Sequence, residues 1–265
     1  LIHPSPQRID PNHQVTWRLV GDIAVVAEGL QERIDAARDA PWLQVWKARE
    51  QAVRQCLSRH VAGAEEDPFT ELHLVARLST RLPEQATLFL GSSMPIRDVD
   101  MMLFSHGEQL KIAANRGASG IDGHLATAAG LAAGSGRPVL ALIGDLALLH
   151  DLNSLTVLAR YRWPVRVVVI NNHGGGIFHF LPIEKFPQVF ETYFATPHQL
   201  TFGQVAGWLN LPYWRCRNGR EFQSALDEAF STSGPELIEV EIDRLQNSRF
   251  LKHLLEQIAT LDLPG

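Results

Sequence analysis

The sequence predicts an α/β protein in which a parallel β-sheet is flanked by helices. From Glu71 onward, short apolar runs alternate with segments whose apolar residues recur at helical spacing, a rhythm typical of parallel sheets. The run from Val139 to Ile143 is apolar throughout and stops at Gly144-Asp145, as expected of a strand buried on both faces. The β-branched run from Val165 to Ile170 ends at two asparagines. A helix between these two runs would complete a β-α-β unit.

Length and composition limit the classes of protein to which this chain can belong. The chain has 265 residues, of which 45% are hydrophobic, so it can bury a sizeable core. A formal net charge of -5 gives no electrostatic footprint for nucleic acid or for an anionic membrane surface. Cys56 and Cys216 lie far apart and outside any CxxC pattern, which argues against a zinc site or a disulfide framework. No apolar run reaches membrane-spanning length, and the first residues lack the features of a signal peptide. We therefore expect a cytoplasmic enzyme.

The first residues are predicted to close a domain whose beginning is missing, since the chain starts at Leu1 and not at Met. Within residues 1–30, a proline-rich entry leads to an expected strand near 15–19, and Gly21-Asp22 then caps a helix. Residues 31–67 are expected to form a charged connecting helix, broken near Pro41, and a linker. Residues 68–245 would form the main domain, and residues 246–265 a C-terminal helical tail.

Prolines delimit the expected elements of the main domain. Pro83 ends its first helix, Pro95 opens its second, and Trp163-Pro164 closes the helix between the two buried strands. Helices are expected over residues 72–82, 95–105, 124–133, 148–161, 202–209 and 221–230, with a terminal helix over 247–261. Strands are expected over residues 87–90, 111–114, 139–143, 165–170, 213–215 and 237–242.

Asp145 and Asn172 follow two strands that we expect to be parallel neighbours, and such strands end at the same edge of a sheet. One carboxylate and one amide oxygen would meet in a crevice there. Magnesium takes one or two protein oxygens of this kind and leaves its other positions to water and phosphate. Gly144 would let the backbone approach a phosphate closely, and free amides at a helix start favour negative charge. The pair therefore indicates a metal-bridged diphosphate.

Each half of this pattern also has a simpler explanation. Gly-Asp after a strand often only caps a helix, and Asn-Asn before glycines is ordinary turn chemistry. Together, Gly144-Asp145 and Asn171-Asn172, separated by residues 146–170, resemble the thiamin diphosphate fingerprint, with Leu146 where its second glycine commonly stands. The alternative from a different class is a non-catalytic α/β nucleotide-binding module.

Three polar loops at this edge make the resemblance specific: GSSMPIRD (residues 91–98), NRGASGIDG (115–123) and NNHGGGIFHFLP (171–182). Over essentially its whole length, the chain resembles the C-terminal half of the 2-succinyl-5-enolpyruvyl-6-hydroxy-3-cyclohexene-1-carboxylate synthase family of menaquinone biosynthesis. Of the three loops, NRGASGIDG best distinguishes this family from related acetolactate synthases and decarboxylases, which have different residues there. These are thiamin diphosphate enzymes of the decarboxylase superfamily. The resemblance implies a thiamin-diphosphate-binding fold, preceded by the end of a middle domain.

The resemblance also implies roles for particular residues. A cation, magnesium or manganese, would be bound by Asp145, Asn172 and the carbonyl of Gly174. The cofactor would contact Ser93, Gly144, Asp145, Leu146 and Asn172, with Ile121 as an apolar support beneath it. Arg97 and Arg116 would bind substrate carboxylates, for which guanidinium groups are suited. An apolar wall for the substrate would consist of Ile177, Phe178 and Leu181. None of the histidines in these loops is expected to be catalytic.

The reaction implied by the resemblance joins 2-oxoglutarate to isochorismate with loss of carbon dioxide. In this superfamily a glutamate that activates the cofactor comes from the N-terminal domain of a partner subunit, and no residue of this chain matches it. We therefore expect the chain alone to be inactive, and the enzyme to be a homodimer or homotetramer. An acetolactate synthase or a 2-oxo-acid decarboxylase is the alternative within the superfamily.

Overall fold

A computed structural model describes the chain except for residues 8–9, 11, 34–40, 63–68, 84, 104–109, 116–119 and 264–265. The chain divides into two compact units, Leu1–Ala52 with Asp262–Gly265, and Val53–Leu261. Most of the predicted linker and the predicted substrate ligand Arg116 lie outside the described residues. Within the part that is described, no helix combines the length and the apolar character needed to cross a bilayer. The domain boundaries expected at residues 30, 67 and 245 stay predictions.

The smaller unit contains a short parallel pairing of β1 (Ile2–His3) with β2 (Leu19–Val20) and the helix α1 (Ile23–Gln31). Asp22 precedes α1, and its carboxylate accepts hydrogen bonds from the backbone amides of Ala24 and Val25 at 2.8 and 3.3 Å. The interpretation of Gly21-Asp22 as a helix cap is thus confirmed. The helix α2 (Pro41–Val61) begins at the proline where the sequence predicts a break.

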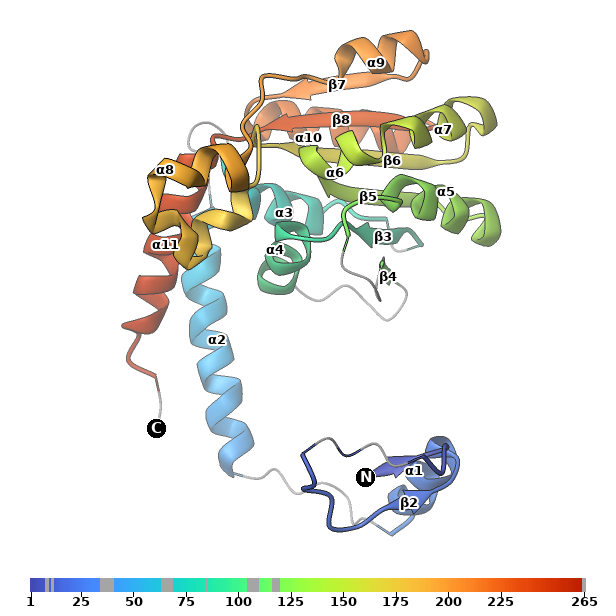
Figure 1. Cartoon of the computed structure of the whole chain (residues 1–265), viewed down its shortest axis with the longest axis vertical. Coiled ribbons are helices and arrows are strands. Elements are labelled where there is room, and N and C mark those ends of the chain that lie inside the picture. The colour runs from blue at the N-terminus through green and yellow to red at the C-terminus, as the bar shows by residue number, and fades with distance from the viewer. Residues whose placement is uncertain are drawn as a thin grey trace. The chain divides into compact units, whose positions relative to one another are not determined.

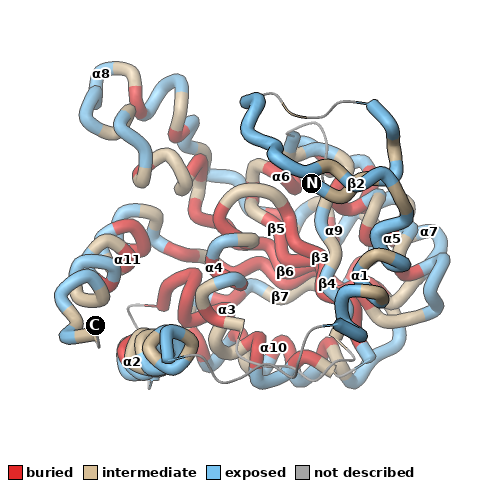
Figure 2. The backbone as a smooth tube through the Cα atoms, turned by 90° about the horizontal axis from the view of Figure 1, so that it is seen from below, coloured by how far each residue is buried: buried red, intermediate tan, exposed pale blue. Residues whose placement is uncertain are grey.

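The larger unit confirms the predicted parallel α/β architecture. Its sheet has the strand order β4-β3-β5-β6-β8-β7, and every neighbouring pair is parallel. The strands are β3 (Thr87–Leu90), β4 (Lys111–Ala114), β5 (Val139–Gly144), β6 (Val165–Asn171), β7 (Tyr213–Cys216) and β8 (Glu236–Glu241). Each lies within one or two residues of the range expected from the sequence. The four inner strands, β3, β5, β6 and β8, are buried along almost their whole length, as the red tube in Figure 2 shows for β5 and β6.

Helices cover both faces of this sheet (Figure 1). They are α3 (Glu71–Ser79), α4 (Met94–Met102), α5 (His124–Ser135), α6 (Asp145–His150), α7 (Leu155–Tyr161), α9 (Gly203–Trp208), α10 (Gly219–Ser231) and α11 (Arg244–Ala259). One apolar cluster lies under α3, α4, α10 and α11, and the other lies under α5, α6, α7 and α9. Successive residues of β5 alternate between the two clusters, because side chains of a strand point to opposite faces.

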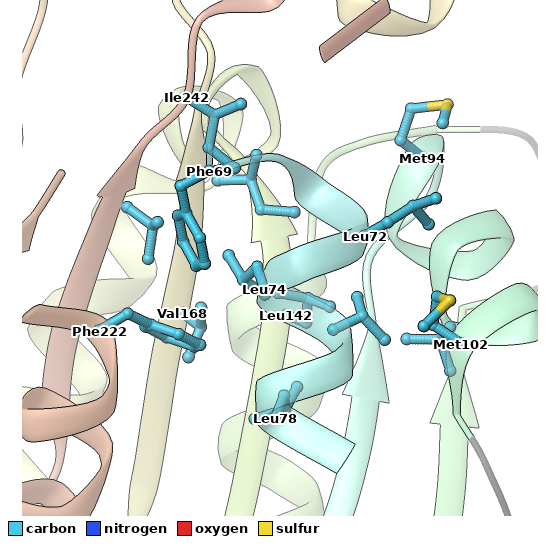
Figure 3. Close-up of a cluster of buried hydrophobic side chains, with 14 of the residues drawn as sticks. Phe69, Leu72, Leu74, Leu78, Met94, Met102, Leu142, Val168, Phe222 and Ile242 are labelled. Carbon is cyan, nitrogen blue, oxygen red and sulfur yellow. The ribbon is translucent and has the colours of Figure 1, made fainter. Parts of the chain in front are cut away.

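The first cluster joins the helices α3 and α10 to the sheet. Figure 3 shows Leu74 of α3 and Phe222 of α10 beside the sheet residues Leu142 and Val168. Phe69, just before α3, packs against Phe222 with ring centroids 6.2 Å apart. These buried contacts place the start of α3 beneath the carboxyl edge of the sheet, where the predicted site lies.

The predicted helix over 148–161 is interrupted. α6 ends at His150, a 3-10 turn follows over Leu152–Ser154, and α7 begins at Leu155. Asp151 causes the break, since its buried carboxylate accepts hydrogen bonds from Leu125 N and Ser154 Oγ, both at 2.6 Å. It thereby caps α5, which has a glycine and no capping side chain before it.

The segment between β6 and α9, of which residues 171–182 were expected to be a loop, contains short helices. It consists of 3-10 turns over Gly176–Phe180 and Pro182–Lys185, α8 (Pro187–Phe190) and a π-helical turn over Glu191–Ala195. Two ion pairs attach it to α11: Arg244 with Glu191 at 2.9 Å and Lys252 with Glu184 at 2.6 Å. These contacts are distant in sequence, so hydrophobic periodicity does not reveal them.

The strand order reverses between β3 and β5. The helices that follow these two strands, α4 and α6, pack in opposite apolar clusters, so the strand ends diverge there. Gly91, at the end of β3, lies so close to β5 that a Cβ atom would be 3.0 Å from Ile143 Cγ2. Open parallel sheets bind ligands outside such a switch point.

Candidate functional site

Asp145 is the first residue of α6 and lies at the carboxyl end of β5. Its side chain is buried, and its oxygens accept hydrogen bonds from Leu146 N at 2.6 Å and Gly174 N at 3.0 Å. The second bond joins the end of β5 to the loop after β6, so the predicted meeting of these two strand ends is present. The amide of Leu146, which the sequence assigned to a diphosphate, donates here to Asp145.

Burial raises the pKa of the Asp145 carboxyl, while the amides of Leu146 and Gly174 and nearby histidines oppose that shift. Nε2 of His198 lies 3.2 Å from Oδ2 of Asp145. The ring of His198 also packs edge-on against His173, with centroids 5.6 Å apart. His198 carried no signal in the sequence, because it lies in an irregular segment far from either motif.

Asn172 follows β6, and its side chain is also buried. Nδ2 donates a hydrogen bond to Oε1 of Glu71 at 3.0 Å, whereas Oδ1 is buried without a hydrogen-bond donor among the described residues. Leaving a buried acceptor unmatched costs about 1 to 3 kcal/mol. Such an atom requires an explanation, and a bound cation would supply one.

Gly174 contributes a backbone that only glycine supports. Its φ is 147°, and a Cβ atom would be 2.4 Å from the carbonyl oxygen of Ala195. The Gly174 carbonyl accepts a hydrogen bond from Gly176 N at 3.0 Å, and a carbonyl oxygen can accept a second contact. The position is therefore compatible with the predicted metal ligand.

The donor set favours a hard cation. In the described part of the chain, no three His, Cys, Asp or Glu side chains gather as they do in a zinc or iron centre. Asp145, Asn172 and the backbone at Gly174 offer oxygen atoms alone, which suit magnesium or manganese. The residues present thus fit the cation that the sequence predicts.

The space at Gly144 is open. Its φ of -83° is accessible to any residue, so the glycine is not needed for the fold of the backbone. A Cβ atom built there would have no atom within 4 Å. The absent side chain leaves room for a ligand above the start of α6, which supports the predicted approach of a phosphate.

His124 holds together the loops after β3 and β4. Its buried ring accepts a hydrogen bond from Ser92 N at Nε2, 3.0 Å away, so Nδ1 carries the proton and donates to Ile121 O at 2.6 Å. Ser93, next to Ser92, has a positive φ of 84°, which is uncommon outside glycine. His124 is therefore structural, and it keeps the predicted cofactor residues Ser93 and Ile121 at this edge of the sheet.

Of the predicted substrate ligands, Arg97 is exposed and donates a hydrogen bond from Nη1 to the carbonyl of Ser93 at 2.8 Å. It lines a cavity of about 560 Å³ together with Leu90, Ile96, Val99, Asp100, Leu103 and Ile112. Arg116 lies outside the described residues, so the predicted pairing of the two arginines stays a prediction.

The predicted apolar wall lies in and after the 3-10 turn that follows β6. Ile177 packs against the apolar cluster under α3 and α4. The ring of Phe178 lies edge-on against Phe194, with centroids 5.5 Å apart. Leu181 is 45% exposed. Ile121 is half-buried and packs against the opposite apolar cluster.

Two acids that the sequence did not indicate lie beneath Asn172. Glu71, the first residue of α3, is 1% exposed, and Asp98, in α4, is fully buried. Burial raises the pKa of both carboxyls, and the charge of Glu71 adds to the rise for Asp98. In the sequence, the one indication that these acids are buried is that each stands among apolar residues of a helix. No local pattern shows that the two acids lie close together.

Comparison with known proteins identifies the family. Residues 101–240 match the family described as thiamine pyrophosphate enzyme, C-terminal TPP binding domain. The chain is 46% identical over 263 residues to 2-succinyl-5-enolpyruvyl-6-hydroxy-3-cyclohexene-1-carboxylate synthase of Rubrobacter xylanophilus, covering 98% of this chain and 44% of that protein. It is 41% identical over 248 residues to the synthase of the same name from Salinibacter ruber, covering 93% and 41%.

Solved structures agree on the fold. A Mycobacterium smegmatis protein described as a candidate thiamin diphosphate-dependent enzyme superposes with a TM-score of 0.68 at 23% identity, covering 91% of this chain and 43% of that one. The chain spans less than half the length of the curated relatives that it matches. It belongs to the thiamine pyrophosphate enzyme family, and its sequence corresponds to the C-terminal part of the 2-succinyl-5-enolpyruvyl-6-hydroxy-3-cyclohexene-1-carboxylate synthases.

Proposed function

We propose that this chain supplies the diphosphate- and metal-binding half of an active site that joins 2-oxoglutarate to isochorismate with loss of carbon dioxide. The observation that carries the proposal is the meeting of Asp145 and Asn172 at the ends of β5 and β6, with Oδ1 of Asn172 buried and unmatched. An acidic and an amide oxygen beside a switch point suit a metal-bound diphosphate.

In this proposal, Asp145, Asn172 and the carbonyl of Gly174 hold magnesium or manganese. The cofactor site is completed by Ser93, Ile121, Gly144 and Leu146. The cation that Asp145 helps to hold would offset the negative charge that two phosphates bring into this buried edge of the sheet. The thiamin diphosphate, when bound, supplies an electron sink for decarboxylation and carbon–carbon bond formation.

The proposed substrates are anionic, and positively charged arginine side chains can bind them. Arg97 and Arg116 bind their carboxylates, while Ile177, Phe178 and Leu181 exclude water from the reacting carbon atoms. Arg97 donates a hydrogen bond to the carbonyl of Ser93, which is itself a proposed cofactor residue. This contact supports a role for Arg97 beside the cofactor.

The proposal includes the assembly. The enzyme is a cytoplasmic homodimer or homotetramer in which the glutamate that activates the cofactor comes from outside the matched region. The 265-residue chain by itself is therefore expected to show no synthase turnover.

Replacing Asp145 tests the proposal most directly. In the full-length enzyme, Asp145→Ala should abolish magnesium-dependent binding of thiamin diphosphate, because it removes the one carboxylate among the proposed ligands. Titration calorimetry with and without magnesium measures the effect. Asp227→Ala, which removes an exposed carboxylate on α10, is the matched control and should bind as the unmodified enzyme does.

Unchanged affinity in Asp145→Ala would mean that Asp145 only caps α6. Binding of ATP or NAD in place of thiamin diphosphate by the unmodified enzyme would favour the non-catalytic nucleotide-binding alternative.

A further inference from the structure

The side-chain amide of Asn172 has two ends of nearly equal size, and only its oxygen can bind a cation. Glu71 lies at one of these ends, with Oε1 3.0 Å from Nδ2 of Asn172. An ionised carboxylate accepts hydrogen bonds and donates none, so it attracts the NH₂ group and repels the oxygen. The opposite end, Oδ1, is then left without a donor.

We infer that Glu71 is a positioning residue for the cation: it fixes the amide of Asn172 so that Oδ1 faces the metal. This inference rests on the proposed function and assigns a task to a residue that touches neither metal nor substrate. Without such an acceptor, the amide could turn and direct its NH₂ group toward the cation, where it would repel the positive charge.

Asp98 accounts for the surroundings of the second Glu71 oxygen. Oε2 of Glu71 and both oxygens of Asp98 are buried and meet no donor from any other described group. Burial raises the pKa of both carboxyls, and the charge of Glu71 adds to the rise for Asp98. The contact of Oε1 with Asn172 needs only an acceptor oxygen at this position.

The backbone of Glu71 is held in place from two directions. Its amide donates to Oδ1 of Asn247 in α11 at 3.0 Å. The preceding residue, Thr70, donates its own amide to Nδ1 of His73 at 3.2 Å, which secures the first turn of α3. A carboxylate fixed in this way can orient its partner without a large loss of side-chain entropy on binding.

The neighbouring Asn171 shows what a purely structural amide looks like. Its Nδ2 donates to Glu239 Oε1 at 2.6 Å and to Leu200 O at 2.9 Å, and its Oδ1 accepts from His173 N at 3.2 Å. Both ends are satisfied. Asn172 also meets a buried glutamate, but its oxygen is left open, which points to a ligand and not to packing.

A purely structural role and a positioning role for Glu71 predict different effects on Mn²⁺ binding. Glu71→Met removes the acceptor of Asn172 Nδ2, so some loss of stability is expected under either role. If Glu71 only supports the fold, the folded variant should bind Mn²⁺ as the unmodified enzyme does. If Glu71 positions Asn172, binding by the folded variant should weaken.

The experiment compares Glu71→Met and Glu71→Gln in the full-length enzyme. Free Mn²⁺ is measured by electron paramagnetic resonance at a fixed concentration of thiamin diphosphate, and unfolding is followed separately without metal or cofactor. Glu71→Met should raise the Mn²⁺ dissociation constant by about tenfold or more. The unfolding measurement should show that the variant is folded under the binding conditions, so that the change in the dissociation constant reports on the site.

Glu71→Gln is the rescuing variant, because its amide oxygen can accept the same hydrogen bond from Asn172. Its Mn²⁺ dissociation constant should stay within a factor of about three of the unmodified enzyme. Equal losses in both variants, or unchanged Mn²⁺ binding by folded Glu71→Met, would each overturn the inference. If the unmodified enzyme showed no cofactor-dependent Mn²⁺ binding, the proposed function would fail with it.

Discussion

Two buried glutamates, Glu239 and Glu71, each accept a hydrogen bond from one of two consecutive asparagines. Glu239 lies on β8, receives Asn171, and has a donor for each of its oxygens. Glu71 lies at the start of α3, receives Asn172, and has an oxygen that meets only the carboxyl of Asp98. All hydrogen-bonding groups around Glu239 find partners within the fold, whereas those around Glu71 do not.

The network around Glu239 joins three segments of chain. Its Oε2 accepts from Phe202 N at 2.8 Å and from the Tyr213 hydroxyl at 2.6 Å, while its Oε1 accepts from Asn171. Burial, followed by the contact with Glu239, raises the pKa of Tyr213, so the phenol remains a donor. The cluster is buried and closed, which is how a polar group stabilises a core.

The difference between the clusters separates scaffold from ligand site. A buried polar group that finds all its partners serves the fold, whereas one that retains an open acceptor retains it at a cost. Asn172, Glu71 and Asp98 carry this cost next to Asp145. The following three substitutions test the separation, beginning with the one of largest effect.

Glu239→Leu should cause the largest loss of stability, on the order of 4 kcal/mol, because it leaves several buried donors without an acceptor. Unfolding in urea, followed by circular dichroism, measures the free energy. Glu241→Leu, two residues further along β8, removes an acceptor whose partners, Arg215 and Arg217, are largely exposed. This control should lose less than about 1 kcal/mol. Equal losses in the two variants would remove the basis of the comparison.

His73→Ala should cost less, about 1 to 2 kcal/mol at neutral pH, by removing the acceptor for Thr70 N and the donor to His60 O. Burial lowers the pKa of His73 below 6.5, so the unfolded chain binds more protons in the range just below that value. Stability from this residue is therefore complete above about pH 6.5 and declines as the pH falls through it.

Urea unfolding at several pH values between 5 and 8 checks both effects, and His73→Ala should flatten the decline on the acid side. His73 lies in the same turn of α3 as Glu71 but is fully hydrogen-bonded. If His73→Ala weakened Mn²⁺ binding but left the free energy of unfolding unchanged, a fully hydrogen-bonded residue of this turn would serve the ligand site. The separation between structural groups with all their partners and ligand-binding groups without them would then be wrong for this turn.

Asp98→Asn should have the smallest effect at pH 5, under about 1 kcal/mol, since the new amide can donate to Glu71 as the protonated carboxyl does. Burial raises the pKa of Asp98 well above 3.8, so the folded chain binds more protons than the unfolded chain above that pH. Stability from this residue is present at acid pH and falls as the pH rises toward the folded pKa.

The slope is thus opposite in sign to that of His73, and Asp98→Asn should remove it. Unfolding measurements at pH 5 and pH 8 on the variant and the unmodified enzyme give the comparison. A variant with the same pH dependence as the unmodified enzyme would show that the raised pKa of Asp98 does not cause this slope.

Much of the candidate site was open to sequence reasoning. Parallel strands end at one edge, so the order of apolar runs was enough to predict that Asp145 and Asn172 would approach each other. The interruption at Asp151 was not predictable from helical spacing, because its cause is a hydrogen bond to Leu125 in another helix. The contact of His198 with Asp145 was missed for the same reason.

By itself, the sequence determined the parallel sheet, the succession of strands and helices, and the two motifs that end β5 and β6. These are local properties, since hydrophobic periodicity and turn residues act over a few positions. Only the tertiary structure decided which buried polar groups have partners. Asn172 and Glu71 are 101 residues apart in the chain, and their hydrogen bond exists because packing of α3 against the sheet brings them together. The chemistry of a polar group determines which hydrogen bonds it can make, but the whole fold determines whether a partner lies within reach.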